Sequence, residues 1–197
     1  MTASLHTGRP FRQPKAFLAA IVFATIAVFA SKAEARPQGN VGLTLGAAEV
    51  GTRDEPFGKL AFSLGGRADV LFLRERNADW GLGPYAEVLT TSFDDLHLGA
   101  GASLLFPVHD YLPLVLSAGG YGRHSALGWE PGVAASLFWG SRSYNYHASY
   151  GLAAGLLVQG RYGLGDSRET AFIVAAQVDA ALLGLPFLMA YEAIRGR

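Results

Sequence analysis

The sequence contains no cysteine and few charged residues. Of its 197 residues, 16% are charged and 50% are hydrophobic, and 16 Lys and Arg balance 16 Asp and Glu. Soluble domains usually carry about 25% charged residues. The lack of cysteine excludes a disulfide scaffold, a Cys-ligated zinc or iron–sulfur centre, a cysteine nucleophile and a lipoprotein anchor. The neutral charge balance is also atypical of a nucleic-acid-binding protein.

Long hydrophobic runs are absent except near the N-terminus. Residues 16–30 are apolar apart from Thr25, follow a basic start, and precede Ala33 and Ala35 in an Ala-x-Ala arrangement. This three-part pattern predicts a secretory signal peptide over residues 1–35. The run is short for a membrane-spanning helix, which needs about 20 residues, although a retained anchor helix is the alternative. The remaining 162 residues would carry 12 Lys and Arg against 15 Asp and Glu, a formal charge of −3.

Helical periodicity is also missing from residues 36–197, where apolar residues instead recur at every second position. The clearest example is 95–106, in which Leu96, Leu98 and Leu104 alternate with His97 and small residues. Alternation of this kind is typical of β-strands. One position, Leu105, breaks the pattern because it is a large apolar residue on the polar side.

Seven turn signals, rich in Gly, Pro, Asp, Asn and Ser, separate the alternating segments. They include Gly128-Trp129-Glu130-Pro131 and Ser141 to Asn145. The pattern therefore predicts eight strands, at 40–49, 58–72, 80–91, 95–106, 112–123, 132–141, 147–162 and 169–183. The tail, Leu185 to Arg195, is expected to be either a continuation or a short amphipathic helix.

The composition of the two strand faces decides between two kinds of barrel. A lipocalin-like carrier turns its apolar face inward, whereas a membrane barrel turns it toward lipid. The polar face here is built of Gly, Ser, Ala and a few charges, which suits the crowded interior of a small barrel. A water-exposed sheet this poor in charge would aggregate. We therefore predict an all-β fold, an eight-stranded antiparallel up-and-down transmembrane β-barrel over 36–197 with a short C-terminal tail.

Alternation then places a set of polar side chains in the lumen. Three are cations and three are anions, and a sealed barrel needs such a balance because an unpaired buried charge is costly. This lumen charge network comprises Arg67, Asp69, Glu87, Arg123, Arg161, Gln177 and Asp179, accompanied by Gln159, His97, Ser103, Ser117, Ser136 and Tyr121. The main interpretation is a structural plug, and the alternative is a narrow pore or a salt-bridge gate for ions or small solutes.

An even strand number places both termini on the periplasmic side. The connections at about 50–57, 92–94, 124–131 and 163–168 would then be extracellular and short, which disfavours large adhesive loops. Aromatic residues near the strand ends are consistent with an interfacial belt: Trp80, Phe93, Phe106, Tyr111, Trp129, Trp139, Tyr144, Tyr146, Tyr150, Tyr162 and Phe187.

The combined pattern resembles the small outer-membrane β-barrel proteins of Gram-negative bacteria. Segments such as Gly83-Pro84-Tyr85, 98–102 and 160–165 read like strands of that family. The resemblance implies outer-membrane lipid, lipopolysaccharide and the outer-membrane assembly machinery as partners, and a monomer that binds no nucleic acid. The chain departs from the family pattern at its end, Ile194 to Arg197, where an aromatic residue is usual.

Some members of that family are lipid A deacylases that resemble serine hydrolases. The candidate residues here are His147 with Ser149, and His124 and Ser125 with Glu130. Hydrolysis requires the Ser, His and carboxylate within hydrogen-bond reach, which neither set is expected to satisfy. The sequence therefore favours a protein that is not an enzyme.

The histidines lie in separate segments without the spacing of metal ligands, so no metal site and no cofactor are predicted. The acidic pairs Asp54-Glu55 and Asp94-Asp95 are expected to be solvated turns. The alternative is that they bind divalent cations that bridge lipopolysaccharide phosphates.

Overall fold

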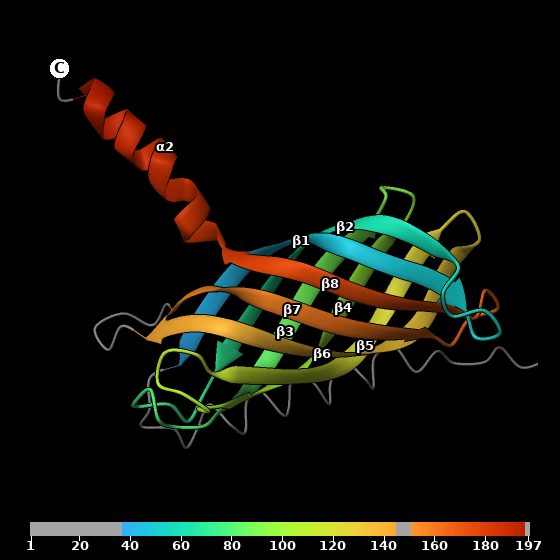
Figure 1. Cartoon of the computed structure of the whole chain (residues 1–197), viewed down its shortest axis with the longest axis horizontal. Coiled ribbons are helices and arrows are strands. Elements are labelled where there is room, and N and C mark those ends of the chain that lie inside the picture. The colour runs from blue at the N-terminus through green and yellow to red at the C-terminus, as the bar shows by residue number, and fades with distance from the viewer. Residues whose placement is uncertain (1–36, 145–150, 196–197) are drawn as a thin grey trace, which may run out of the picture. The chain divides into compact units, whose positions relative to one another are not determined.

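The computed structural model describes residues 37–144 and 151–195, which form one closed β-barrel and a C-terminal helix (Figure 1). The predicted signal peptide lies outside the described residues. The strands are β1 (Gln38–Thr52), β2 (Lys59–Leu71), β3 (Gly81–Thr91), β4 (Leu96–Phe106), β5 (Leu114–Ser125), β6 (Gly128–Tyr144), β7 (Gly151–Gly163) and β8 (Glu169–Asp179). Helix α2 spans Ala180–Arg195. The predicted fold class is therefore confirmed.

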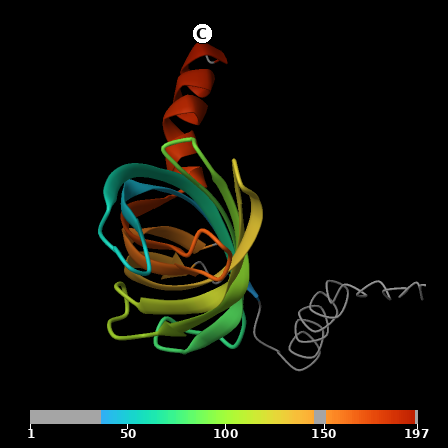
Figure 2. The same cartoon turned by 90° about the vertical axis from the view of Figure 1, so that its right-hand side faces the viewer.

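Every strand pairs antiparallel with its neighbour in sequence, and β8 pairs with β1 to close the ring (Figure 2). A row of paired residues that starts at Asn40 passes once around the barrel and returns to β1 at Val50. This displacement of ten residues means that the strands are tilted by about 40° to the barrel axis. At that tilt, eight strands enclose an interior that side chains can fill.

The outward face of the barrel is almost free of charge. Its large side chains are apolar and strongly exposed, as at Leu45, Leu98 and Leu156, which are 53%, 48% and 45% exposed. Glu49, near the end of β1, is the only formally charged residue at an outward strand position in the described part of the chain. A closed barrel removes every sheet edge and hides all backbone polar groups, as lipid requires. The structure is therefore a transmembrane β-barrel.

Both ends of β6 differ from the sequence prediction for local reasons. The expected turn at 128–131 belongs to β6, since β5 and β6 stay paired as far as Ser125 and Gly128. The hairpin is closed by the two residues 126 and 127, and Gly128 adopts a φ of +96° that favours glycine. At its other end β6 continues through Arg142 to Tyr144. The predicted turn at 141–145 therefore begins too early.

The last strand ends four residues before the predicted limit of 183. Asp179 ends the strand and starts the helix, because its Oδ1 accepts a hydrogen bond from the backbone N–H of Ala181 at 2.7 Å. An aspartate in this N-cap position satisfies a free N–H and favours the helix N-terminus electrostatically. The apolar run that follows therefore forms α2 and does not extend β8. No helix in the described ranges is both long and apolar enough to cross a membrane.

The interior contains two apolar clusters in addition to the predicted polar groups. One consists of Leu71, Leu105, Val115, Phe138, Ala153 and Leu157. The other consists of Ala48, Leu89, Ile173 and Ala175, with Val50 packed against it. The unexpected apolar residue on the polar side of β4, Leu105, is thus fully buried inside the barrel. Together the clusters fill much of the space that the small residues leave open.

Exposed aromatic side chains lie near the strand ends. Trp80 packs edge-on against Phe106 with ring centroids 4.5 Å apart, and Phe93 lies 6.0 Å from Phe62. The other exposed members near strand ends are Tyr111, Trp129, Trp139 and Tyr162, whereas Phe187 of the predicted belt is exposed on α2. Tyr146 and Tyr150 lie outside the described residues, as does the side chain of Tyr144. A belt of exposed aromatic side chains suits the interface between lipid and water.

Candidate functional site

Arg67 on β2 lies at the centre of the polar interior. Its guanidinium donates hydrogen bonds to the hydroxyls of Ser117, Ser136 and Ser103, at 2.5, 3.1 and 3.3 Å. These serines come from β5, β6 and β4, so one side chain crosses the lumen to three strands. The guanidinium also lies 3.5 Å from Glu87 and over the ring of Tyr85.

Glu87 on β3 joins this group to the far wall. One of its oxygens accepts a 2.7 Å hydrogen bond from Arg161 of β7, and both oxygens accept hydrogen bonds from Gln159. The carboxylate and both arginines, Arg67 and Arg161, are at least nine-tenths buried. A buried carboxylate held by two guanidiniums and an amide is well compensated.

Asp69 pairs with a residue outside the predicted lumen charge network. It forms a two-pronged ion pair with Arg142 of β6, and both residues are almost completely buried. Arg142 was missed because the sequence prediction assigned it to a turn. Once β6 extends to Tyr144, the same alternation that places Ser136 in the lumen also places Arg142 there.

The remaining predicted members are buried but take no part in the arginine–carboxylate pairs above. Asp179 accepts a 2.6 Å hydrogen bond from Asn40 and caps α2. Gln177 lies against Gly42, where an added Cβ would come within 3.1 Å of the amide. Among the described residues, therefore, the structure joins Arg67, Glu87, Arg161 and Gln159 in one network and places Asp69 with Arg142 in a separate pair.

Arg123 belongs to a third group at one end of the barrel. We call this end the mouth; it carries the loops 53–58, 92–95, 126–127 and 164–168. The guanidinium lies 2.6 Å from Glu169, 3.2 Å from Asp95 and 3.4 Å from Glu130. The sequence prediction placed these three carboxylates in turns or at strand starts, so it did not include them among the lumen charges.

Three further contacts hold the mouth together. The backbone N–H of Ser167 donates to Glu130 at 2.8 Å, and Arg53 donates to the carbonyl of Gly163 at 2.9 Å while stacking on Tyr162. The loop between β7 and β8 is thereby fastened to β6, and the end of β7 is fastened to the β1–β2 loop.

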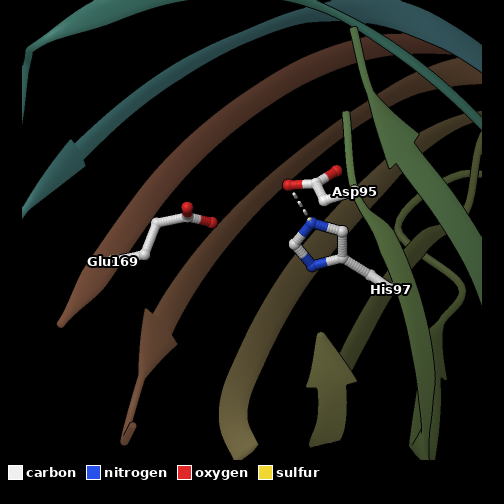
Figure 3. Close-up of side chains that lie close together, drawn as sticks. All are labelled: Asp95, His97 and Glu169. Carbon is white, nitrogen blue, oxygen red and sulfur yellow. Dashed lines mark ion pairs between the residues drawn. The ribbon is translucent and has the colours of Figure 1, made fainter. Parts of the chain in front are cut away.

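His97 lies on β4 and Asp95 lies in the loop before it. Glu169 faces them from β8 across the barrel (Figure 3). The imidazole Nε2 of His97 is 3.0 Å from Asp95. Burial alone would raise the pKa of Asp95, but His97, the N–H of Thr91 and Arg123 hold it at about 2. Asp95 is therefore ionised at every physiological pH.

These three residues are the candidate metal centre in the described part of the chain. One ligand atom from each lies within 4.8 Å of the other two. The sequence could not indicate this group, because Glu169 is more than 70 residues from His97 and reaches it only through barrel closure. Asp94, the other member of the acidic pair, is exposed and lies 4.0 Å from Lys59.

Among the described residues, the hydrolase candidates do not come together in one site. His124 is exposed on the outward face against Trp129, whereas Glu130 points inward to Arg123. Ser125 accepts a hydrogen bond from the N–H of Leu127 within the hairpin. His147 and Ser149 lie outside the described residues.

The fold is similar to solved membrane barrels. A designed transmembrane β-barrel is 10% identical, with 73% of this chain and 97% of that chain covered and a TM-score of 0.41. The outer-membrane protein Ail of Yersinia pestis, solved in a phospholipid bilayer nanodisc, is 11% identical, with 72% and 99% covered and a TM-score of 0.38. No protein-family model and no curated protein matches the sequence.

The closed ring of eight antiparallel strands and its almost uncharged outer face define the class of protein. The chain is a small membrane β-barrel of the outer-membrane type.

Proposed function

We propose that the protein is a non-enzymatic barrel of the outer membrane with a plugged lumen and a structural or interaction role. On this proposal residues 1–35 direct export and are cleaved, and the barrel is monomeric. Its partners are outer-membrane lipid, lipopolysaccharide and the assembly machinery. Both termini of the strand array then face the periplasm, and the mouth faces the outside.

The observation that supports the plug is that polar side chains bridge opposite walls. Arg67 reaches from β2 to Ser136 on β6, and Glu87 reaches from β3 to Arg161 on β7. The apolar cluster around Leu105 and Phe138 occupies further interior space. A conducting pore would need a continuous water path through this packed and paired interior.

Conductance across a planar lipid bilayer tests the proposal. The refolded full chain is expected to give no defined unitary steps over many insertions. A double variant, Arg67→Ala with Glu87→Ala, removes the central bridge and is expected to give small steps. The lipid-facing variant Leu98→Ala is the matched control and is expected to stay silent.

Defined steps from the unmodified protein would contradict the plug and favour a narrow channel. Each variant must first show the heat-modifiable gel migration of a folded barrel, so that leakage from misfolded protein is not mistaken for conduction.

The hydrolase alternative has its own test. Lipid A from cells with the protein and with its Ser149→Ala variant should have the same acylation by mass spectrometry.

A further inference from the structure

The mouth holds three potential metal ligands on opposite sides of the barrel. Asp95 immediately precedes β4, His97 is the second residue of β4, and Glu169 is the first residue of β8. Figure 3 shows the Glu169 carboxylate and the His97 imidazole directed toward each other across the interior. One imidazole nitrogen and two carboxylate oxygens within 4.8 Å form a donor set that Zn²⁺ and similar ions accept.

The state of His97 is an independent reason to expect a ligand. Its side chain is only 2% exposed. Its Nε2 lies 3.0 Å from Asp95, but its Nδ1 has no hydrogen-bond partner in the described part of the chain. Buried polar groups nearly always find a partner, so an imidazole in this position needs an explanation. A coordinated cation would supply one.

The formal charge at the mouth also favours a bound cation. Asp95, Glu130 and Glu169 surround one cation, Arg123, which leaves a formal charge of −2. The deeper groups carry no such excess of negative charge, since Arg67 and Arg161 flank Glu87 with a formal charge of +1, and Arg142 pairs with Asp69. A divalent cation would neutralise the excess at the mouth.

Small side-chain movements can bring the three ligand atoms to the spacing that a bound ion requires. Tetrahedral zinc with bonds of about 2.1 Å holds its ligand atoms roughly 3.4 Å apart. Glu169 is 13% exposed in its side chain and has three rotatable bonds, so its carboxylate can approach His97. Arg123 can keep its contact with Glu130 while one oxygen of Glu169 turns to the metal.

We propose that Asp95, His97 and Glu169 bind one divalent transition-metal ion of the Zn²⁺ type at the mouth. The ion would connect β4 to β8, which are on opposite walls and share no hydrogen bonds. Its effect would be to fasten the mouth and to resist unfolding from that end. Glu130 would remain with Arg123 and the N–H of Ser167, and would not be a ligand.

Zinc binding by the refolded full chain in phosphate-free, lipopolysaccharide-free detergent tests the proposal. Equilibrium dialysis against micromolar Zn²⁺ with elemental analysis should find one ion per chain. The variants His97→Gln and Glu169→Gln should each weaken binding by at least about tenfold, as expected when a metal site loses a supporting group. Saturating Zn²⁺ should also raise the denaturation midpoint of the unmodified protein.

Two controls separate this site from other zinc-binding groups. His124→Ala removes an exposed histidine on the outer face, and Glu130→Gln removes a mouth carboxylate outside the ligand set. His124→Ala should bind zinc as the unmodified protein does, and Glu130→Gln should lose much less affinity than Glu169→Gln. The proposal is overturned if the unmodified protein binds no stoichiometric zinc, or if His97→Gln binds it equally well. It is also overturned if Glu130→Gln and Glu169→Gln lose binding to the same extent, because general negative charge would then be responsible.

Discussion

Arg142 and Asp69 connect β6 to β2 through an ion pair that is almost completely removed from water. Removing one member leaves the other charged and unpaired in the lumen. Arg142→Met should therefore lower the free energy of unfolding by about 3–5 kcal/mol. Urea unfolding of the protein refolded into lipid vesicles measures this loss.

The matched variant removes both charges. Arg142→Met with Asp69→Leu should recover much of the lost stability, because an apolar pair of similar volume can replace a buried ion pair. A single variant that unfolds like the unmodified protein would contradict this account. A double variant that loses more stability than the two single variants lose together would also contradict it.

Asp79, in the turn between β2 and β3, has a pH-dependent role. Its carboxylate accepts hydrogen bonds from the backbone N–H groups of Arg76 and Glu75, at 2.7 and 3.0 Å. The bond from Arg76 is the main reason that the pKa of Asp79 is lowered below its usual value. A lowered pKa means that the carboxylate stabilises the fold above an unfolded value of about 3.9, and that this is lost as pH falls through the folded pKa.

The measurable consequence is a pH-dependent difference between Asp79→Asn and the unmodified protein. The unmodified protein should have the higher urea midpoint at neutral pH, and the two midpoints should converge as the pH drops well below 4. Asp110→Asn, in the exposed turn between β4 and β5, is the control and should show no such convergence. A difference that is constant from pH 7 to pH 3 would contradict the role given to Asp79.

At the scale of the strands, close approach of the backbone determines where glycine is required. Gly101 on β4 and Gly119 on β5 are paired on the inner face, and a Cβ at Gly101 would lie 2.2 Å from the carbonyl oxygen of Ala118. Backbone atoms cannot move aside as a flexible side chain can. Gly101→Ala should therefore destabilise the barrel by about 1–3 kcal/mol.

Gly160 on β7 provides the matched control, because a Cβ added there meets nothing within 4 Å. Gly160→Ala should be neutral or stabilise the barrel by up to about 1 kcal/mol, since alanine restricts the unfolded chain. Equal urea midpoints for the two alanine variants would show that the β4–β5 approach is not as close as described.

The strands also show how far sequence alternation can be followed. Alternation identifies which face of β4 turns inward, and His97 and Ser103 lie there. It could not predict Arg142 or Glu130, because each was assigned to a turn on the strength of nearby Gly, Pro, Ser or Asn. In both places strand pairing overrides local turn preference, since each added residue of β6 gains hydrogen bonds to β5 or β7.

At the scale of the whole molecule, the sequence indicates barrel closure but not which residues meet across the lumen. Alternation assigns each side chain to a face and says nothing of height or of the opposite wall. The partnership of Asp69 with Arg142, and of Glu169 with Asp95 and His97, depends on the ten-residue displacement with which β8 closes on β1. That displacement is a property of all eight registers together.

The central claim is that the apolar face of a closed barrel is turned to lipid. Because the chain has no cysteine, single-cysteine variants of residues Phe172 to Asp179 on β8 each carry one spin label in the refolded protein. Accessibility to oxygen dissolved in the bilayer should alternate strictly, high at Phe172, Val174, Ala176 and Val178 and low at the residues between them. High accessibility at Ile173, Ala175 and Gln177 instead, or no alternation along β8, would contradict the account.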